Sequence, residues 1–194
     1  MGCHTILADT NITHMKTVTY EGLTFDEYIS KEEIAQMVEH VAKQIAADYQ
    51  DKKPVIICVL HGAVFFTTDL MRALPIDCTL ATVHLQSYDG TSSTGQVREN
   101  VPLQTDIRDK DVIVVEDIVD SGITMHYFKQ ILRSRQPRTV KVAALLTKPS
   151  ELQYEDAKPD YVGREIPKKF VIGYGFDIHD YARNLPEIYA LREQ

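Results

Sequence analysis

Three acidic residues lie beside glycine and hydroxyl residues in the segment 116–124, which reads EDIVDSGIT. Ser121 and Thr124 offer hydroxyl donors, and Gly122 lets the main chain approach a ligand closely. If a helix begins here, its first N–H groups have no partner within the helix and, together with the helix dipole, form a site for an anion. The segment is therefore predicted to bind a phosphate group.

The carboxylates of Glu116, Asp117 and Asp120 need a separate explanation, because acids beside a phosphate repel it. They fit the site if they bind sugar hydroxyls or a hard cation such as Mg²⁺. The alternative is a helix start enriched in acids, which is the better explanation for any one of them alone. For the whole string after a buried strand, ligand binding is favoured. The segment has no lysine and the chain has no G-x-G-x-x-G, which excludes the common nucleotide-binding loops.

The surrounding residues predict the elements that hold this segment in place. Apolar and β-branched runs predict four strands, at 55–60, 79–85, 111–116 and 139–147. Helices are predicted at 64–74 and 123–135, and another begins at a capping box of Ser30 and Glu33. Strands that are apolar on both faces and alternate with helices indicate an α/β protein with a parallel sheet covered on both sides. Ligands of such sheets bind beyond the carboxyl ends of the strands.

The bulk composition is typical of one globular domain, which we place at 1–194. The net charge of −7 argues against non-specific binding to nucleic acid or to a membrane. No apolar run approaches the length of a membrane span and no signal-peptide pattern is present, so a cytoplasmic location is expected. Residues 1–14 are expected to form a loosely ordered leader. The three cysteines share no metal-binding or redox spacing.

The segment 114–124, VVEDIVDSGIT, resembles the ribose-diphosphate signature of the type I phosphoribosyltransferases. The resemblance implies a mainly parallel sheet flanked by helices, with a small hood formed by terminal segments to which residues 148–194 contribute. It implies that Glu116 and Asp117 hold the ribose hydroxyls and Mg²⁺. It also implies that five consecutive residues cradle the 5′-phosphate, namely Asp120, Ser121, Gly122, Ile123 and Thr124.

The segment LHGA at 60–63 resembles the pyrophosphate loop of the hypoxanthine-guanine phosphoribosyltransferases. The resemblance implies that Leu60, His61 and Gly62 contact pyrophosphate, and that a cis peptide bond joins Leu60 to His61. The family usually has Lys or Arg at the position of His61, so the sequence departs from the pattern there. The effect of this exchange on pyrophosphate binding stays open.

Two segments resemble the base-binding parts of the same enzymes. LLTK at 145–148 places Lys148 where it can donate to the carbonyl oxygen of a 6-oxopurine. In KFVIGY at 169–174, Phe170 can stack on the purine, and the main chain at Val171 can meet its far edge. Alone, a lysine ending a strand is usually solvated and such a phenylalanine usually belongs to the core. In register with the phosphate segment, the functional interpretation is favoured.

The resemblance also covers two residues near the C-terminus and a lid. Asp177 would bind a second Mg²⁺, directly or through water, and Arg183 would contact the pyrophosphate. If Asp177 and Arg183 formed only an isolated ion pair at the surface, they would contribute little to stability. Ser87 and Tyr88 begin a polar segment that resembles the mobile lid, which would close and exclude water. The alternative is an ordinary surface loop.

The implied reaction joins a purine to 5-phosphoribosyl diphosphate. A purine imidazole nitrogen displaces pyrophosphate, and Asp120 accepts a proton from the other imidazole nitrogen as general base. Mg²⁺ neutralises the departing diphosphate. Hypoxanthine and guanine are the expected purines, giving IMP and GMP, with xanthine as an alternative preference.

The alternative from another class is a regulatory protein of the same fold that binds 5-phosphoribosyl diphosphate as a signal. Such proteins usually add a nucleic-acid-binding element, and no basic helix is present here. A homodimer or homotetramer is expected from the resemblance alone.

Overall fold

A computed structural model of the chain describes residues 16–87 and 97–193. Within them, six strands form the larger sheet: β3 Val55–Leu60, β4 Thr79–Ser87, β5 Val97–Val101, β6 Asp111–Val119, β7 Thr139–Thr147 and β8 Tyr161–Glu165. Their order is β5-β4-β3-β6-β7-β8. All neighbours run parallel except β5, which is antiparallel to β4. The prediction of an α/β protein with a mainly parallel sheet is therefore confirmed.

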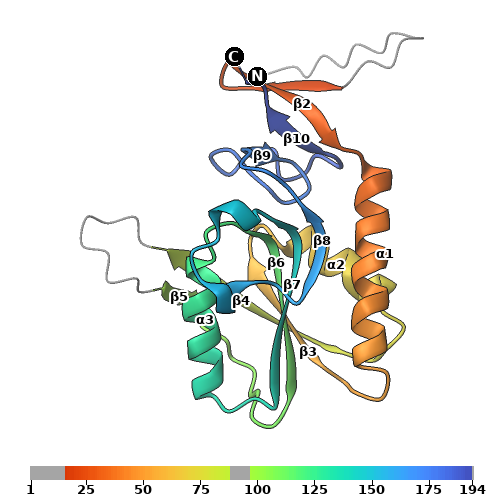
Figure 1. Cartoon of the computed structure of the whole chain (residues 1–194), viewed down its shortest axis with the longest axis vertical. Helices are drawn as coiled ribbons and strands as arrows, with labels where there is room; N and C mark the ends of the chain where they lie inside the picture. Colours follow the sequence, from red (N-terminus) through yellow and green to blue (C-terminus); the bar gives the residue numbers. More distant parts are fainter. Residues whose placement is uncertain (1–15, 88–96, 194) are drawn as a thin grey trace.

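Helices cover both faces of this sheet, namely α1 Lys31–Asp48, α2 Val64–Ala73 and α3 Ile123–Ser134. On one face, Ile45 of α1 and Phe66 of α2 share a core with Ile113 of β6. On the other face, Phe128 of α3 shares a core with Val114 of β6. Figure 1 shows α3 and α1 on opposite sides of the sheet. Apolar side chains on both faces of β6 thus explain why a helix is needed on each side.

The two ends of the described chain form a second, antiparallel sheet of four strands: β1 Thr17–Tyr20, β2 Leu23–Ile29, β9 Val171–Ile172 and β10 Ile188–Leu191. Phe25, Ile172 and Tyr189 form a small core of its own. Figure 1 places this sheet beyond the edge of the larger sheet at which β6 ends and α3 begins. The hood of terminal segments therefore sits above the carboxyl ends of the parallel strands. The expected leader 1–14 lies outside the described residues.

Strand β6 runs further than its apolar run predicts. The sequence indicates an end at 116, whereas β6 continues to Val119 because Ile118 and Val119 still pair with β7. Glu116 and Asp117 therefore lie within the strand rather than after it, and neighbouring side chains of a strand point to opposite faces. Strand β5 is not among the four strands that the sequence predicts.

Candidate active site

The turn between β6 and α3 has the geometry of an anion site at a helix start. Gly122 is the N-cap residue of α3 and has φ +76°, a left-handed conformation that favours glycine. A Cβ added there would lie 2.7 Å from Leu152 Cδ1 and 2.8 Å from Ala157 Cβ. The conformation and the close neighbours both select glycine, and no side chain caps the helix.

The N–H groups of this turn are available to a ligand. In the part of the chain that the structure describes, the amides of Ser121, Gly122 and Thr124 have no acceptor. The Ile123 amide has only a 3.5 Å contact with the Ser121 hydroxyl. The first main-chain bond of the helix runs from the His126 N–H to the Gly122 carbonyl, at 2.9 Å. The predicted phosphate segment thus keeps the donors that an anion requires.

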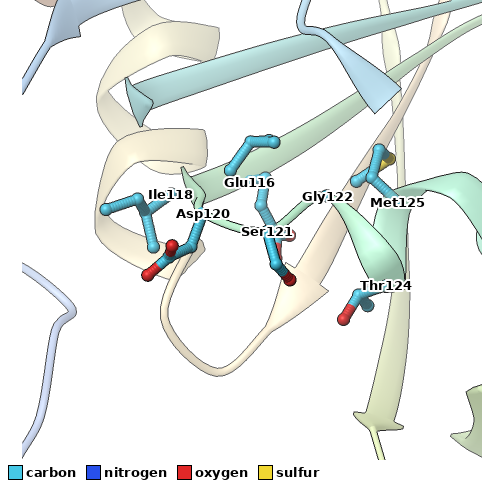
Figure 2. A pocket seen from close by; sticks show the side chains of 8 residues that line it. Glu116, Ile118, Asp120, Ser121, Gly122, Thr124 and Met125 are labelled. Carbon is cyan, nitrogen blue, oxygen red and sulfur yellow. The ribbon is translucent and has the colours of Figure 1, made fainter. Parts of the chain in front are cut away.

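A pocket of about 340 Å³, part of it open to solvent, lies at this turn. Figure 2 shows the Asp120 carboxylate and the hydroxyls of Ser121 and Thr124 on the same side of the turn. The lining residues are Glu116, Ile118, Val119, Asp120, Ser121, Gly122, Thr124 and Met125. Of the residues predicted to bind ribose and 5′-phosphate, Asp117 and Ile123 do not line it.

Glu116 and Asp117 face different parts of the site. Glu116 lines the pocket, and its Oε2 is buried without a hydrogen-bond partner among the described residues. Asp117 faces the loop after β3, because a Cβ added to Gly62 would lie 1.8 Å from Asp117 Oδ2. The acidic pair is therefore divided between the pocket and this loop.

Burial raises the pKa of both carboxyl groups. The pKa of Glu116 lies well above its ordinary value, chiefly through burial and secondly through the charge of Asp117. Burial raises the pKa of Asp117 to about 6, although the Ile118 N–H donates to its Oδ1 at 2.8 Å and the charge of Arg183 acts in the opposite direction. A cation or hydrogen-bond donor brought by a ligand would lower both values.

The loop after β3 contains the predicted cis peptide bond between Leu60 and His61. His61 is exposed, and its ring centroid lies 4.6 Å from that of His84 on β4. Gly62 lies between Asp117 and the hood, since a Cβ added to Gly175 would lie 2.0 Å from the Gly62 carbonyl oxygen. Sequence reasoning missed His84, although the parallel register pairs it with Leu60.

Arg183 and Asp177 form a contact beside the same loop. Arg183 Nη2 lies 2.9 Å from Asp177 Oδ1, and Nη1 donates to the Gly175 carbonyl oxygen at 2.8 Å. Because Gly175 contacts Gly62, Arg183 is anchored next to the predicted pyrophosphate loop. Arg183 Nη2 also lies 3.1 Å from Asp180 Oδ1. The structure therefore brings Asp117, Asp177 and Arg183 into one electrostatic group.

Lys148 and Asp120 form an ion pair across the ends of β6 and β7. Lys148 Nζ donates to Asp120 Oδ2 at 2.6 Å. The lysine side chain is 11% exposed and the aspartate side chain 49% exposed. The buried cation therefore holds one oxygen of a carboxylate that is open to the pocket. The predicted general base and the predicted donor to the purine carbonyl are thus in direct contact.

Phe170 and Val171 lie at the start of β9. Phe170 is 48% exposed, with its ring 6.1 Å from that of Phe25, whereas Val171 is buried. No described contact joins either residue to Asp120 or Lys148. Two residues before Phe170, Lys168 pairs with Glu151 at 2.8 Å. This bond raises the pKa of Lys168, and the charge of Asp120 raises it further by a smaller amount. Sequence reasoning did not single out Lys168.

The remaining predictions meet the structure only in part. Ser87 is the last residue of β4, and Tyr88 with the rest of the predicted lid lies outside the described residues. Among the described residues, no three His, Cys, Asp or Glu side chains converge as a complete metal site. Across the described ranges, no helix is long and apolar enough to cross a membrane.

Comparison with known proteins places these features in a family. Residues 24–179 match the phosphoribosyl transferase domain. This chain belongs to the phosphoribosyl transferase family. The matched range contains the turn at Gly122, the loop at His61 and the Asp120–Lys148 pair.

Individual family members cover most of the chain. A hypoxanthine-guanine-xanthine phosphoribosyltransferase of Tritrichomonas foetus is 40% identical over 84% of this chain and 90% of its own length. A hypoxanthine-guanine phosphoribosyltransferase of Bacillus subtilis is 38% identical over 84% of this chain and 91% of its own length. The structure of the Trypanosoma cruzi hypoxanthine phosphoribosyltransferase, in complex with the product IMP, is similar with a TM-score of 0.81 and 36% identity. It covers 90% of this chain and 97% of its own.

Proposed function

We propose that this family member transfers the 5-phosphoribosyl group from 5-phosphoribosyl diphosphate to hypoxanthine, guanine or both, giving IMP or GMP and pyrophosphate in purine salvage. The observation that carries the proposal is the start of α3, where free N–H groups lie next to the Asp120–Lys148 pair. The reaction needs a phosphate site and a base site side by side. The relatives from Tritrichomonas foetus and Bacillus subtilis carry names of this activity.

The 5′-phosphate would bind at the start of α3. Amides of the turn donate to its oxygens, and the hydroxyls of Ser121 and Thr124 supply further donors on the same side. Glu116 would accept a hydrogen bond from a ribose hydroxyl within the pocket. Its Oε2 is buried without a partner, which is costly unless a ligand supplies one.

The diphosphate would lie over the loop containing Leu60, His61 and Gly62. Arg183 is held beside this loop and can donate to phosphate oxygens. Asp117 would hold one Mg²⁺ at this loop, and Asp177 would hold a second, directly or through water. Glu116, which faces the pocket, would bind Mg²⁺ or a hydroxyl from the ribose side. Mg²⁺ commonly takes one or two carboxylates plus substrate phosphates, so a partial protein site fits it. When bound, the ion neutralises the charge that develops on the departing diphosphate.

The purine would bind between Asp120 and Lys148. Their contact of 2.6 Å has no room for a base, so the pair opens when the purine enters. Lys148 then donates to the 6-carbonyl oxygen, and Asp120 accepts a proton from a ring nitrogen as general base while the other imidazole nitrogen attacks the ribose carbon. Phe170 has an exposed face for stacking, and the main chain of Val171 would meet the far edge of the base.

Xanthine is a second candidate acceptor. The Tritrichomonas foetus relative, at 40% identity, includes xanthine in its name. Xanthine differs from hypoxanthine at the 2-position, where the purine edge would meet the segment around Val171. A binding protein without turnover is the remaining alternative, and the Asp120–Lys148 pair favours an enzyme over it.

A steady-state assay tests the proposal. Purified chain is incubated with 5-phosphoribosyl diphosphate, Mg²⁺ and each of hypoxanthine, guanine, xanthine, adenine and uracil. We expect turnover with hypoxanthine or guanine, and its loss when Mg²⁺ is chelated. Binding of 5-phosphoribosyl diphosphate with no turnover of any base would support the regulatory alternative instead.

Assembly and location belong to the same proposal. We propose a homodimer or homotetramer acting in the cytoplasm on small-molecule substrates, without nucleic acid or membrane partners. Light scattering coupled to size-exclusion chromatography distinguishes these assemblies from a monomer. A monomer that keeps full turnover at assay concentration would contradict the proposed assembly.

A further inference from the structure

The segment between β7 and β8 packs beneath the phosphate turn rather than in the pocket. It contains two short 3₁₀ helices, η1 Pro149–Glu151 and η2 Glu155–Ala157. None of the residues 149–157 lines the pocket. We call residues 148–157 the brace segment, and its contacts reach both the turn and the first turns of α3.

The main chain of the brace segment is bonded to the turn at two points. The Gln153 N–H donates to the Ser121 carbonyl oxygen at 2.9 Å, and the Lys148 N–H donates to that of Val119 at 3.0 Å. Between them, the Leu152 side chain fills the space that a Cβ of Gly122 would need. These bonds use carbonyl oxygens of the turn and leave the N–H groups of Ser121, Gly122 and Thr124 without an acceptor among the described residues.

Side chains of the brace segment also hold the first turns of α3. The His126 ring stacks on Tyr154 with centroids 4.1 Å apart and an angle of 15° between the planes. His126 Nδ1 lies 2.6 Å from Asp156 Oδ1. Lys129 Nζ donates to the Asp156 carbonyl oxygen at 2.6 Å. His126 is also the residue whose N–H makes the first bond of α3, to Gly122.

We propose that Tyr154 and Asp156 are positioning residues, which hold the phosphate-binding amides in place through His126. They touch no ligand in this account. A row of amides binds an anion well only if it is preorganised, because a displacement of a few tenths of an ångström weakens every bond at once. This inference rests on the proposed function of the turn as the 5′-phosphate site.

The brace segment also begins with Lys148, the proposed donor to the purine. One short segment therefore carries the purine contact at one end and supports the phosphate turn at the other. The Lys148–Asp120 ion pair is a further contact between the brace segment and the phosphate turn, because Asp120 belongs to that turn. A defect at Tyr154 or Asp156 should thus act first on phosphate binding, and on purine binding only through the turn.

Ribose 5-phosphate is the direct probe, because it reads the phosphate site without catalysis. Calorimetric titration compares the parent chain with Tyr154→Leu and Asp156→Ala, which remove the stack and the acceptor. We expect each truncation to weaken binding by roughly tenfold or more, and to raise KM for 5-phosphoribosyl diphosphate more than KM for hypoxanthine. Tyr154→Phe keeps the ring and Asp156→Asn keeps Oδ1, so both should bind within about twofold of the parent chain.

A matched control separates positioning from loss of stability. Tyr161→Phe removes a Tyr–Asp bond of 2.7 Å, from Tyr161 to Asp48, and should change stability without changing ribose 5-phosphate binding. Unchanged binding in folded Tyr154→Leu and Asp156→Ala overturns the brace while leaving the proposed function intact. Should a truncation fail to fold, the other truncation and His126→Phe, which keeps an aromatic ring for the stack but removes the contact with Asp156, carry the test. Weakened binding by either with a normal Tyr161→Phe supports the brace, and parent-like binding overturns it. If the parent chain binds no ribose 5-phosphate, both proposals fall.

Discussion

The first turns of α1 and α3 differ in whether side chains accept hydrogen bonds from their N–H groups. In α1, the Ser30 hydroxyl accepts from the Glu33 N–H at 3.2 Å, and Glu33 Oε2 accepts from the Ser30 N–H at 2.9 Å. In α3, Gly122 offers no side chain and the neighbouring amides stay open. The start of α1 thus pairs two of its donors within the protein, whereas the start of α3 leaves its donors open to a ligand.

The acidic residues near these two helix starts differ in the same way. Glu33 has its pKa lowered, first by the Ser30 N–H and then by Arg164, so its charge is stabilised within the protein. Glu116 and Asp117 have raised pKa values because burial is not offset in the same way. The acid at the start of α1 is thus paired in the free chain, whereas Oε2 of Glu116 lacks a partner among the described residues.

The largest expected effect is from Asp120→Asn. Asparagine is as good as aspartate near a helix start, so a purely architectural Asp120 would tolerate the change. As general base it would not, and kcat should fall by roughly 10²–10⁴, beyond the loss of melting temperature that follows when Lys148 loses its charged partner. Steady-state kinetics with hypoxanthine measures this, with exposed Asp106→Asn as control. A fall of less than about threefold would leave Asp120 without a chemical role.

Gly122→Ala should damage the start of α3 through both conformation and space. The left-handed conformation costs about 1–2 kcal/mol, and overpacking against Leu152 and Ala157 costs a further ~1–3 kcal/mol. Gly22→Ala is the matched control, because Gly22 has φ +80° but nothing within 4 Å of the added Cβ. Urea unfolding should show the larger loss for Gly122→Ala. Equal losses of unfolding free energy in the two variants would mean that Leu152 and Ala157 can move aside for the added methyl group at little cost.

Asp117 should make the stability depend on pH. Its pKa rises from the ordinary 3.8 to about 6 in the folded chain, so the folded state binds the proton more tightly. Between these two values the free energy of unfolding falls as pH rises, with a slope of at most about 1.4 kcal/mol for each pH unit. Asp117→Asn should therefore gain stability over the parent chain from about pH 4 to pH 6, and keep a constant advantage above that. A difference that does not vary with pH would contradict the burial of this charge.

The smallest expected effect on stability is from Ser30→Ala, which changes the start of α1 rather than that of α3. Loss of the capping box should cost about 1 kcal/mol of stability. Activity measured well below the melting temperature should not change, because α1 faces no ligand. A selective loss of ribose 5-phosphate binding in this variant would show that the two helix starts are not independent.

Much of the fold could be predicted because local chemistry decides it. The runs at 55–60 and 139–147 became β3 and β7 with the expected bounds, and the capping box starts α1. The end of β6 could not be predicted from its own residues, since pairing with β7 extends it past Glu116. That tertiary effect also divides Glu116 from Asp117, because residues within a strand alternate in direction.

The site could be predicted in residue type but not in pairing. The EDIVDSGIT string indicates the phosphate turn, yet nothing in it indicates that Lys148, 28 residues further on, holds Asp120. The supporting residues of the brace segment were missed for the same reason: Tyr154 and Asp156 carry no motif, and they contact the helix through His126. Contacts between separate strand ends depend on sheet order, which local sequence does not determine.

The open amides at the start of α3 are the centre of this account, and backbone NMR tests them directly. Ribose 5-phosphate is titrated into isotope-labelled chain while the amide resonances are followed. Residues 121–124 should show the largest shifts, whereas those of Ser30 and Glu33 should stay unchanged. Saturable binding that leaves 121–124 unperturbed and shifts other amides would contradict the account.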